Sequence, residues 1–163
     1  MENSKIEFNA EKLEPFFSDL IDTQFSTTLM LEANRNEPLK VLIDEQMKTS
    51  SIIKRISKLY FSSVDSPLIY SISHINDLSL SEQERNLILE HQIPLGKLFS
   101  RLHGPKSIKK YNLEVEKSAF THIANKMHLD SKMLFKKKYD FFINNRHVAF
   151  IEEYFSPESI QRT

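Results

Sequence analysis

Residues 133–157 read MLFKKKYDFFINNRHVAFIEEYFSP and contain two extended apolar segments, Met133–Ile143 and His147–Phe155. Aromatic and β-branched residues are concentrated in both segments, which is typical of β-strands. Asn144 and Asn145 lie between them, and consecutive asparagines favour a tight hairpin turn because asparagine tolerates positive φ. This stretch therefore predicts two antiparallel strands joined by a short turn.

Four further segments have the composition of strands: Leu39–Met47, Ile52–Phe61, Leu68–Ile75 and Ile108–Val115. The first of them alternates apolar and polar residues, which is the pattern of a strand with one buried face. The second and third are separated by a polar turn that ends at Pro67, so they are predicted to form a second hairpin. The sequence therefore predicts about six strands.

Helical patterns occupy the chain between these groups of strands. They lie at Leu13–Ile21 with Asn9 as N-cap, at Thr27–Asn34, after the capping box Ser81 and Glu84, after Pro94 up to Gly104, and across residues 118–131. Helices inserted among hairpins favour an antiparallel sheet over a βαβ fold. We predict an α+β fold with about six antiparallel strands, in a single domain of residues 1–163.

The composition of the chain limits its partners. Its 163 residues hold 22 basic and 22 acidic side chains and no cysteine. A net charge of zero gives no overall field for nucleic acid or an anionic membrane, so an anion site must be local. No stretch is long and apolar enough for a membrane span. A cytoplasmic protein that binds a small molecule is expected, with neither a nucleic-acid partner nor a membrane span.

Several common catalytic and cofactor motifs are missing from the sequence. The six histidines form no HExxH pair, so no metal site is predicted. Only two glycines occur, Gly96 and Gly104, which excludes a P-loop and a dinucleotide fingerprint. A GxSxG nucleophile is also absent. No cofactor is predicted.

Four stretches of the sequence form an ordered set: Thr27-Thr28 before the strand that follows Pro38, Arg55 with Pro67–Ser73, Pro94-Leu95-Gly96, and Glu153-Tyr154-Phe155-Ser156-Pro157. Together they resemble the chorismate lyase-like family, which includes bacterial chorismate lyase and its archaeal relatives. The resemblance covers about residues 27–157. It departs from the family pattern at Ile72, where many members carry an arginine, at Lys137 and Lys138, which replace an arginine pair, and at His147, which replaces a proline.

The resemblance implies a carbon–oxygen lyase that expels pyruvate from chorismate and leaves a hydroxybenzoate, most simply 4-hydroxybenzoate. Arg55 would then bind the ring carboxylate through its planar fork, with the backbone N–H of Leu95 at a helix start as a second donor. Glu153 would be the catalytic acid or base, because burial at the far end of the pocket raises a carboxyl pKa. The remaining implied binding residues are Thr27, Gly96, Lys137 and Lys138.

Alternatives to these assignments remain open. Strand alternation does not decide between Glu153 and Glu152 as the acid or base. Arg55 can equally be one partner of a surface ion pair, and the lysine run a solvated face. Because Ile72 replaces an arginine, the alternative function is a non-catalytic module of the same fold that binds an aromatic carboxylate, as effector domains of some regulators do. A scaffold protein would instead show a large exposed apolar patch.

Overall fold

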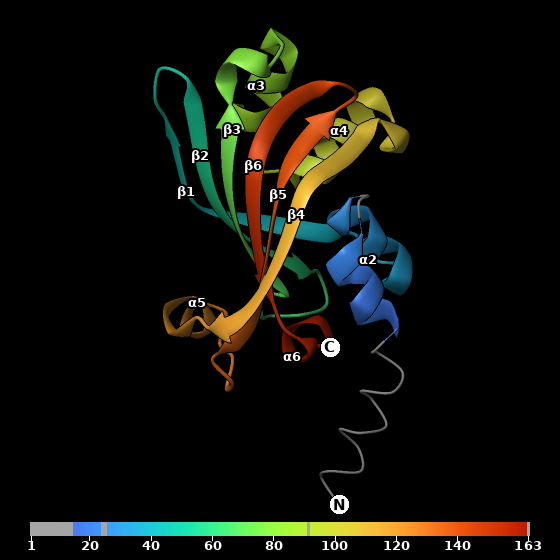
Figure 1. Cartoon of the computed structure of the whole chain (residues 1–163), viewed down its shortest axis with the longest axis vertical. Coiled ribbons are helices and arrows are strands. Elements are labelled where there is room, and N and C mark those ends of the chain that lie inside the picture. The colour runs from blue at the N-terminus through green and yellow to red at the C-terminus, as the bar shows by residue number, and fades with distance from the viewer. Residues whose placement is uncertain (1–14, 24–25, 91, 163) are drawn as a thin grey trace, which may run out of the picture.

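The computed structural model describes residues 15–23, 26–90 and 92–162. Six strands form one antiparallel sheet in the order β1-β2-β3-β6-β5-β4 (Figure 1). Their bounds are β1 Leu39–Lys48, β2 Ile52–Phe61, β3 Ile69–Asn76, β4 Ile108–Ala119, β5 Met133–Ile143 and β6 Arg146–Phe155. The predicted α+β class and the antiparallel sheet are confirmed, and the hairpin of residues 133–157 is the β5–β6 pair.

Residues 15–22 are helical, and further helices and short 3-10 turns precede, separate and follow the strands. They are α2 Thr27–Arg35, η1 Asp77–Ser79, α3 Glu82–Glu90, α4 Leu95–His103, η2 Pro105–Ser107, α5 Thr121–Lys126 and α6 Pro157–Ile160. The Ser81–Glu84 capping box forms as predicted, with both reciprocal hydrogen bonds. Asn9 and Leu13 of the first predicted helix lie outside the described residues. In the part of the chain that the structure describes, no helix is long and apolar enough to cross a membrane.

One face of the sheet, called here the inner face, is covered by helices and holds most of the core. At one end, Ile88 of α3 and Phe99 of α4 pack against β2, β3, β5 and β6. At the other end, Leu20 and Leu31 pack against β1, β2 and β6. The helix pair 15–22 and α2 thus covers one half of the inner face and α3 and α4 cover the other, so a boundary between the two helical groups crosses the sheet.

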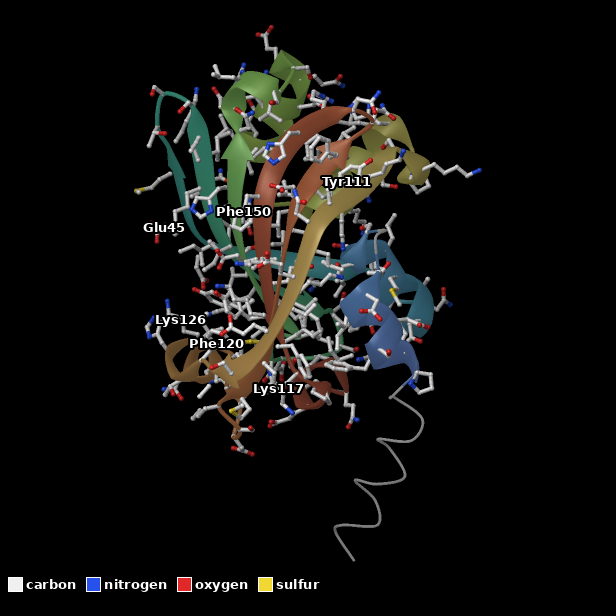
Figure 2. The ribbon with its side chains drawn as sticks, viewed as in Figure 1. Glu45, Tyr111, Lys117, Phe120, Lys126 and Phe150 are labelled. Carbon is white, nitrogen blue, oxygen red and sulfur yellow. The ribbon has the colours of Figure 1, made fainter. Side chains whose placement is uncertain are left out.

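Among the described residues, the opposite, outer face is covered by a helix near α5, at one end of the sheet (Figure 1). Ala124 and Met127 pack there against Tyr70 and Tyr154. In Figure 2, the labelled Phe120 lies beside α5, whereas Phe150 lies farther along the sheet, where no helix covers it. The helices on the inner face, and not those on the outer face, are therefore placed to enclose a ligand.

Two predicted elements differ from the observed ones by more than a residue or two at one end. Strand β4 runs to Ala119 and not Val115, because Ser118 and Ala119 continue the pairing with Leu134 and Met133 of β5. The helix predicted over residues 118–131 is correspondingly reduced to α5. Alternation along β4 is interrupted by a bulge after Tyr111, where Asn112 has φ 55°.

Candidate functional site

A small pocket lies on the inner face at the boundary between the two helical groups. Its volume is about 40 Å³, and its walls come from the sheet and from the first turns of α2 and α4. The charged and phenolic side chains among its lining residues are Arg55, Lys110, Tyr139 and Glu153. Hydroxyl groups of Ser26, Thr27, Thr28, Ser57, Ser71 and Ser73 also line it. The pocket is therefore polar although it lies within the core.

The sheet register sets the order of the charged groups across the pocket. Glu153 on β6 lies directly opposite Lys137 on β5, and Lys110 is on the neighbouring strand β4. Arg55 is on β2, which is separated from β6 by β3 alone, so about 10 Å of sheet lies between the arginine and glutamate strands. Two serines of β3, Ser71 and Ser73, lie in that interval. The pocket thus has a guanidinium at one end and a carboxyl group with two amines at the other.

Arg55 is 1% exposed and is held by three hydrogen bonds. Its Nε donates to Gln46 Oε1 at 3.0 Å, and its two terminal nitrogens donate to the carbonyls of Ile93 and Ile88 at 2.9 Å each. Burial lowers the pKa of Arg55 to about 10, so the side chain remains charged at neutral pH. The surface ion pair that the sequence left open is therefore excluded. Arg55 instead fixes the connection from α3 to α4, and a guanidinium has five N–H donors, so two remain after these three bonds.

Glu153 is buried and is bound by groups from two other elements. Thr27 at the start of α2 donates its hydroxyl to Glu153 Oε1 at 3.0 Å. The Tyr139 hydroxyl on β5 is also within hydrogen-bonding reach, and burial together with the Glu153 charge raises the pKa of Tyr139 well above its usual value. Glu152 points to the outer face, where it accepts a hydrogen bond from Tyr154 at 2.8 Å. Of the two glutamates that alternation could not separate, Glu153 is the one in the pocket.

Lys110 lines the pocket and was missed by the sequence analysis. It is 2% exposed, its amine donates to Thr27 Oγ1 at 2.6 Å, and it lies 4.4 Å from the centre of the Tyr139 ring. Burial lowers its pKa to about 7; nearby Glu153 opposes the shift and Lys137 adds to it. Alternation from Ile108, the buried first residue of β4, places Lys110 on the inner face, and this signal could have identified it.

Lys137 and Lys138 point to opposite faces of the sheet, although the sequence grouped them as binding residues. Lys137 is fully buried and donates to the carbonyls of Leu20 and Thr23 at the end of helix 15–22, beside the pocket. Burial lowers its pKa, while Glu153 acts in the opposite direction. Lys138 extends from the outer face to Glu114 at 2.9 Å and does not reach the pocket. Because successive strand residues alternate between faces, the grouping of Lys138 with Lys137 is corrected.

The remaining predicted binding residues, Thr27, Leu95 and Gly96, lie at the first turns of α2 and α4 and line the pocket. Gly96 allows these turns to approach closely, because a Cβ at this position would lie 2.3 Å from Ser26 Oγ. The Ser26 side chain caps α2, whereas α4 has no side-chain cap. The free N–H groups and partial positive charge of the α4 start therefore face the same pocket.

Ile72, where the family resemblance expects an arginine, is not part of this pocket. It lies on the outer face against the cluster around α5, while its neighbours Ser71 and Ser73 line the pocket. The replacement of an arginine by Ile72 therefore removes no charge from the inner face. Among the described residues, no group of three or more histidine, aspartate or glutamate side chains is arranged to hold a metal ion.

Comparison with solved structures identifies proteins of similar fold. The ligand-binding domain of a putative GntR-family transcriptional regulator from Bordetella bronchiseptica is 11% identical, with a TM-score of 0.52 over 72% of this chain and 84% of that chain. The effector domain of PhnF from Mycobacterium smegmatis is 8% identical, with a TM-score of 0.55 over 82% of this chain and 90% of that chain.

The C-terminal domain of the histidine utilization repressor from Pseudomonas syringae pv. tomato str. DC3000 is 6% identical, with a TM-score of 0.51 over 74% of this chain and 93% of that chain. The sequence matches no protein-family model and no curated protein. At these identities the likeness shows the fold: this chain has the sheet and helix arrangement found in ligand-binding domains of transcriptional regulators.

Proposed function

We propose that the chain is a non-catalytic binding domain that holds a small carboxylate in the pocket between the sheet and the first turns of α2 and α4. The observation that carries this proposal is the charge of the buried groups. Arg55, Lys110 and Lys137 are three buried cations in or beside the pocket, and Glu153 is the one buried carboxylate among the described residues there. Buried charge is costly unless it is paired, so an anion that enters the pocket is stabilised.

The hydrogen-bond donors fit a carboxylate in particular. Arg55 has two N–H groups beyond the three that bond Gln46, Ile88 and Ile93, and the start of α4, which has no side-chain cap, supplies backbone N–H groups. The similar structures described as ligand-binding and effector domains of regulators support a binding role without turnover. On this proposal the resemblance to the chorismate lyase-like family reflects a shared fold and a shared mode of carboxylate binding.

The size of the pocket limits the ligand. A volume of about 40 Å³ is well below the roughly 300 Å³ at which pockets for drug-sized ligands begin. An acid of two to four carbons needs less rearrangement than an aromatic acid, which requires α2 and α4 to separate. Arg55 bonds the carbonyls of Ile88 and Ile93, so transfer of its donors to a larger ligand would also release the α3–α4 connection. Such a release would be a route by which ligand binding changes the surface of the domain.

Calorimetric titration with glycolate and with 4-hydroxybenzoate tests this function. One site per chain is expected for glycolate. The matched variants are Lys110→Met, which removes an inner-face amine, and Lys138→Met, which removes an outer-face amine from the same sheet. Binding should weaken in the first variant and stay unchanged in the second. No binding of either acid, or equal binding by both variants, would count against the pocket as the site.

A second candidate function is the chorismate-cleaving lyase that the family resemblance implies. It is favoured by one observation, the placement of Arg55 and Glu153 in a single pocket. A carboxylate clamp and a proton-transfer group at opposite ends are what the elimination needs. Purified protein should then release pyruvate from chorismate faster than the uncatalysed reaction, and Glu153→Gln should abolish the difference. Binding without pyruvate release leaves the binding domain as the function.

A further inference from the structure

Lys110 is a buried amine that lines the pocket without a direct contact to a carboxylate among the described residues. We propose that Lys110 is a nucleophile that captures the carbonyl carbon of a small oxo acid as an imine, in the pocket that also binds the acid's carboxylate. This inference rests on the proposed carboxylate-binding function and names the ligand class: a 2-oxo acid of two to four carbons, or the corresponding aldehyde acid.

The surroundings of Lys110 differ from those of an ion-paired lysine. Among the described residues, ion pairs form at other lysines, including Lys97 with Glu32, and none includes Lys110. Its described side-chain hydrogen bond goes to the neutral hydroxyl of Thr27. The Lys137 amine is within hydrogen-bonding reach of Lys110, and the Glu153 carboxylate attracts Lys110 from beyond ion-pair distance. The Lys110 amine therefore has no direct carboxylate contact within the described part of the chain, and it faces a cavity that a ligand can enter.

The protonation state suits nucleophilic attack. Burial and the nearby Lys137 bring the pKa of Lys110 to about 7, against the opposing effect of Glu153. The amine can therefore release its proton near neutral pH, and the neutral form carries a free lone pair. Desolvation and a neighbouring cation are the two means by which proteins activate lysine as a nucleophile. An exposed lysine such as Lys138, whose pKa is raised by Glu114, remains protonated at the same pH.

The chemical step balances with groups that line the pocket. The Lys110 lone pair forms a bond to the carbonyl carbon, and the C=O π electrons move to oxygen, which gives a carbinolamine after one proton passes from nitrogen to oxygen. Loss of the hydroxyl group as water then forms the C=N bond. The net change is amine plus carbonyl to imine plus water, with no oxidant or reductant.

Thr27 and Glu153 provide a route for the proton. The Thr27 hydroxyl accepts a hydrogen bond from Lys110 at 2.6 Å and donates one to Glu153 at 3.0 Å. A proton can pass from the amine to the carboxylate through this single hydroxyl and return to the departing oxygen. The carboxylate of the ligand is left for Arg55 and the start of α4, as in the proposed binding function.

Reductive trapping tests the inference on the complete chain. The protein is mixed with glyoxylate at about pH 7.5, reduced with limiting cyanoborohydride, and digested, and the modified peptides are mapped by mass spectrometry. The expected result is one carboxymethyl group per chain, located on Lys110, and excess glycolate should suppress it. Lys138→Met should label as the unmodified protein does, whereas Lys110→Arg, which keeps the charge, should lose the adduct.

The outcomes separate this inference from the proposed function. Labelling spread over exposed lysines, with Lys110 unmodified, overturns the inference even if calorimetry shows that glycolate binds. If glycolate does not bind and does not protect, but Lys110 is still the residue that is modified, the carboxylate-binding function fails while the reactive lysine stands. The site is mapped in the unmodified protein, so the test does not depend on the folding of any variant.

Discussion

The buried amine of Lys110 should make the stability of the parent protein depend on pH, and Lys110→Met should remove this dependence. The pKa of Lys110 is about 7 in the folded chain, against 10.5 for an exposed lysine. Between these two values the unfolded chain holds a proton on Lys110 that the folded chain has released. The free energy of unfolding therefore rises with pH across this window, by about 1.4 kcal/mol per pH unit and at most by about 5 kcal/mol in total. Below pH 7 both states are protonated and the full cost of burying the ammonium group is present.

Replacement of Lys110 by methionine removes that cost and keeps an unbranched side chain of similar length. In urea unfolding at pH 7, 8 and 9, the Lys110→Met variant should be more stable than the parent at pH 7. The difference in unfolding free energy should then shrink by about 1 kcal/mol for each unit by which the pH rises. Lys138→Met, on the outer face, should leave the pH dependence as it is. Parallel stability curves for the parent and Lys110→Met would refute a depressed Lys110 pKa and the protonation that nucleophilic attack requires.

Three further changes have outcomes set by the structure. Glu84→Gln should lower the free energy of unfolding in urea by about 3–5 kcal/mol, because Glu84 is buried and accepts hydrogen bonds from Arg146 and His103. Burial raises the pKa of Glu84, but those hydrogen bonds and the Ser81 N–H lower it to about 2. The contribution of Glu84 to stability should therefore be present above pH 4.5 and disappear as the pH falls toward 2. Gly96→Ala should cost about 1–2 kcal/mol, since the new Cβ displaces the Ser26 cap of α2, and unchanged thermal stability would contradict that contact. Arg55→Lys should weaken glycolate binding about tenfold or more in calorimetry, because an ammonium group cannot reproduce the planar fork, and full affinity would assign the carboxylate to other donors.

Much of the fold could be predicted from the sequence because its signals are local. Strand composition, the Asn144-Asn145 turn and the Ser81–Glu84 capping box act within a few residues, and each gave an element close to the observed one. The end of β4 was wrong because its last residues are held by pairing with β5 across the sheet, and their own composition does not show it.

The candidate site could be predicted only in part, because residue type alone does not show on which face of the sheet a side chain lies. Arg55, Leu95 and Glu153 were found through a resemblance, and the structure brings all three to one pocket. Lys138 was grouped with Lys137 by adjacency, although adjacent strand residues point apart. Lys110 was passed over because a lysine on a strand is most often solvated. Alternation from Ile108 indicates the face on which Lys110 lies, but the burial of a lysine on that face depends on where α2 and α4 cover the sheet.

The position of a bound acid is the most direct test of the pocket. A structure determined with glycolate present should place its carboxylate within hydrogen-bonding distance of Arg55 or of the backbone N–H groups at the start of α4, and its other end toward Lys110 and Glu153. Glycolate bound on the outer face beside Lys138, or an inner pocket that stays closed to the acid at saturating concentration, would contradict the assignment of the buried cations to ligand binding.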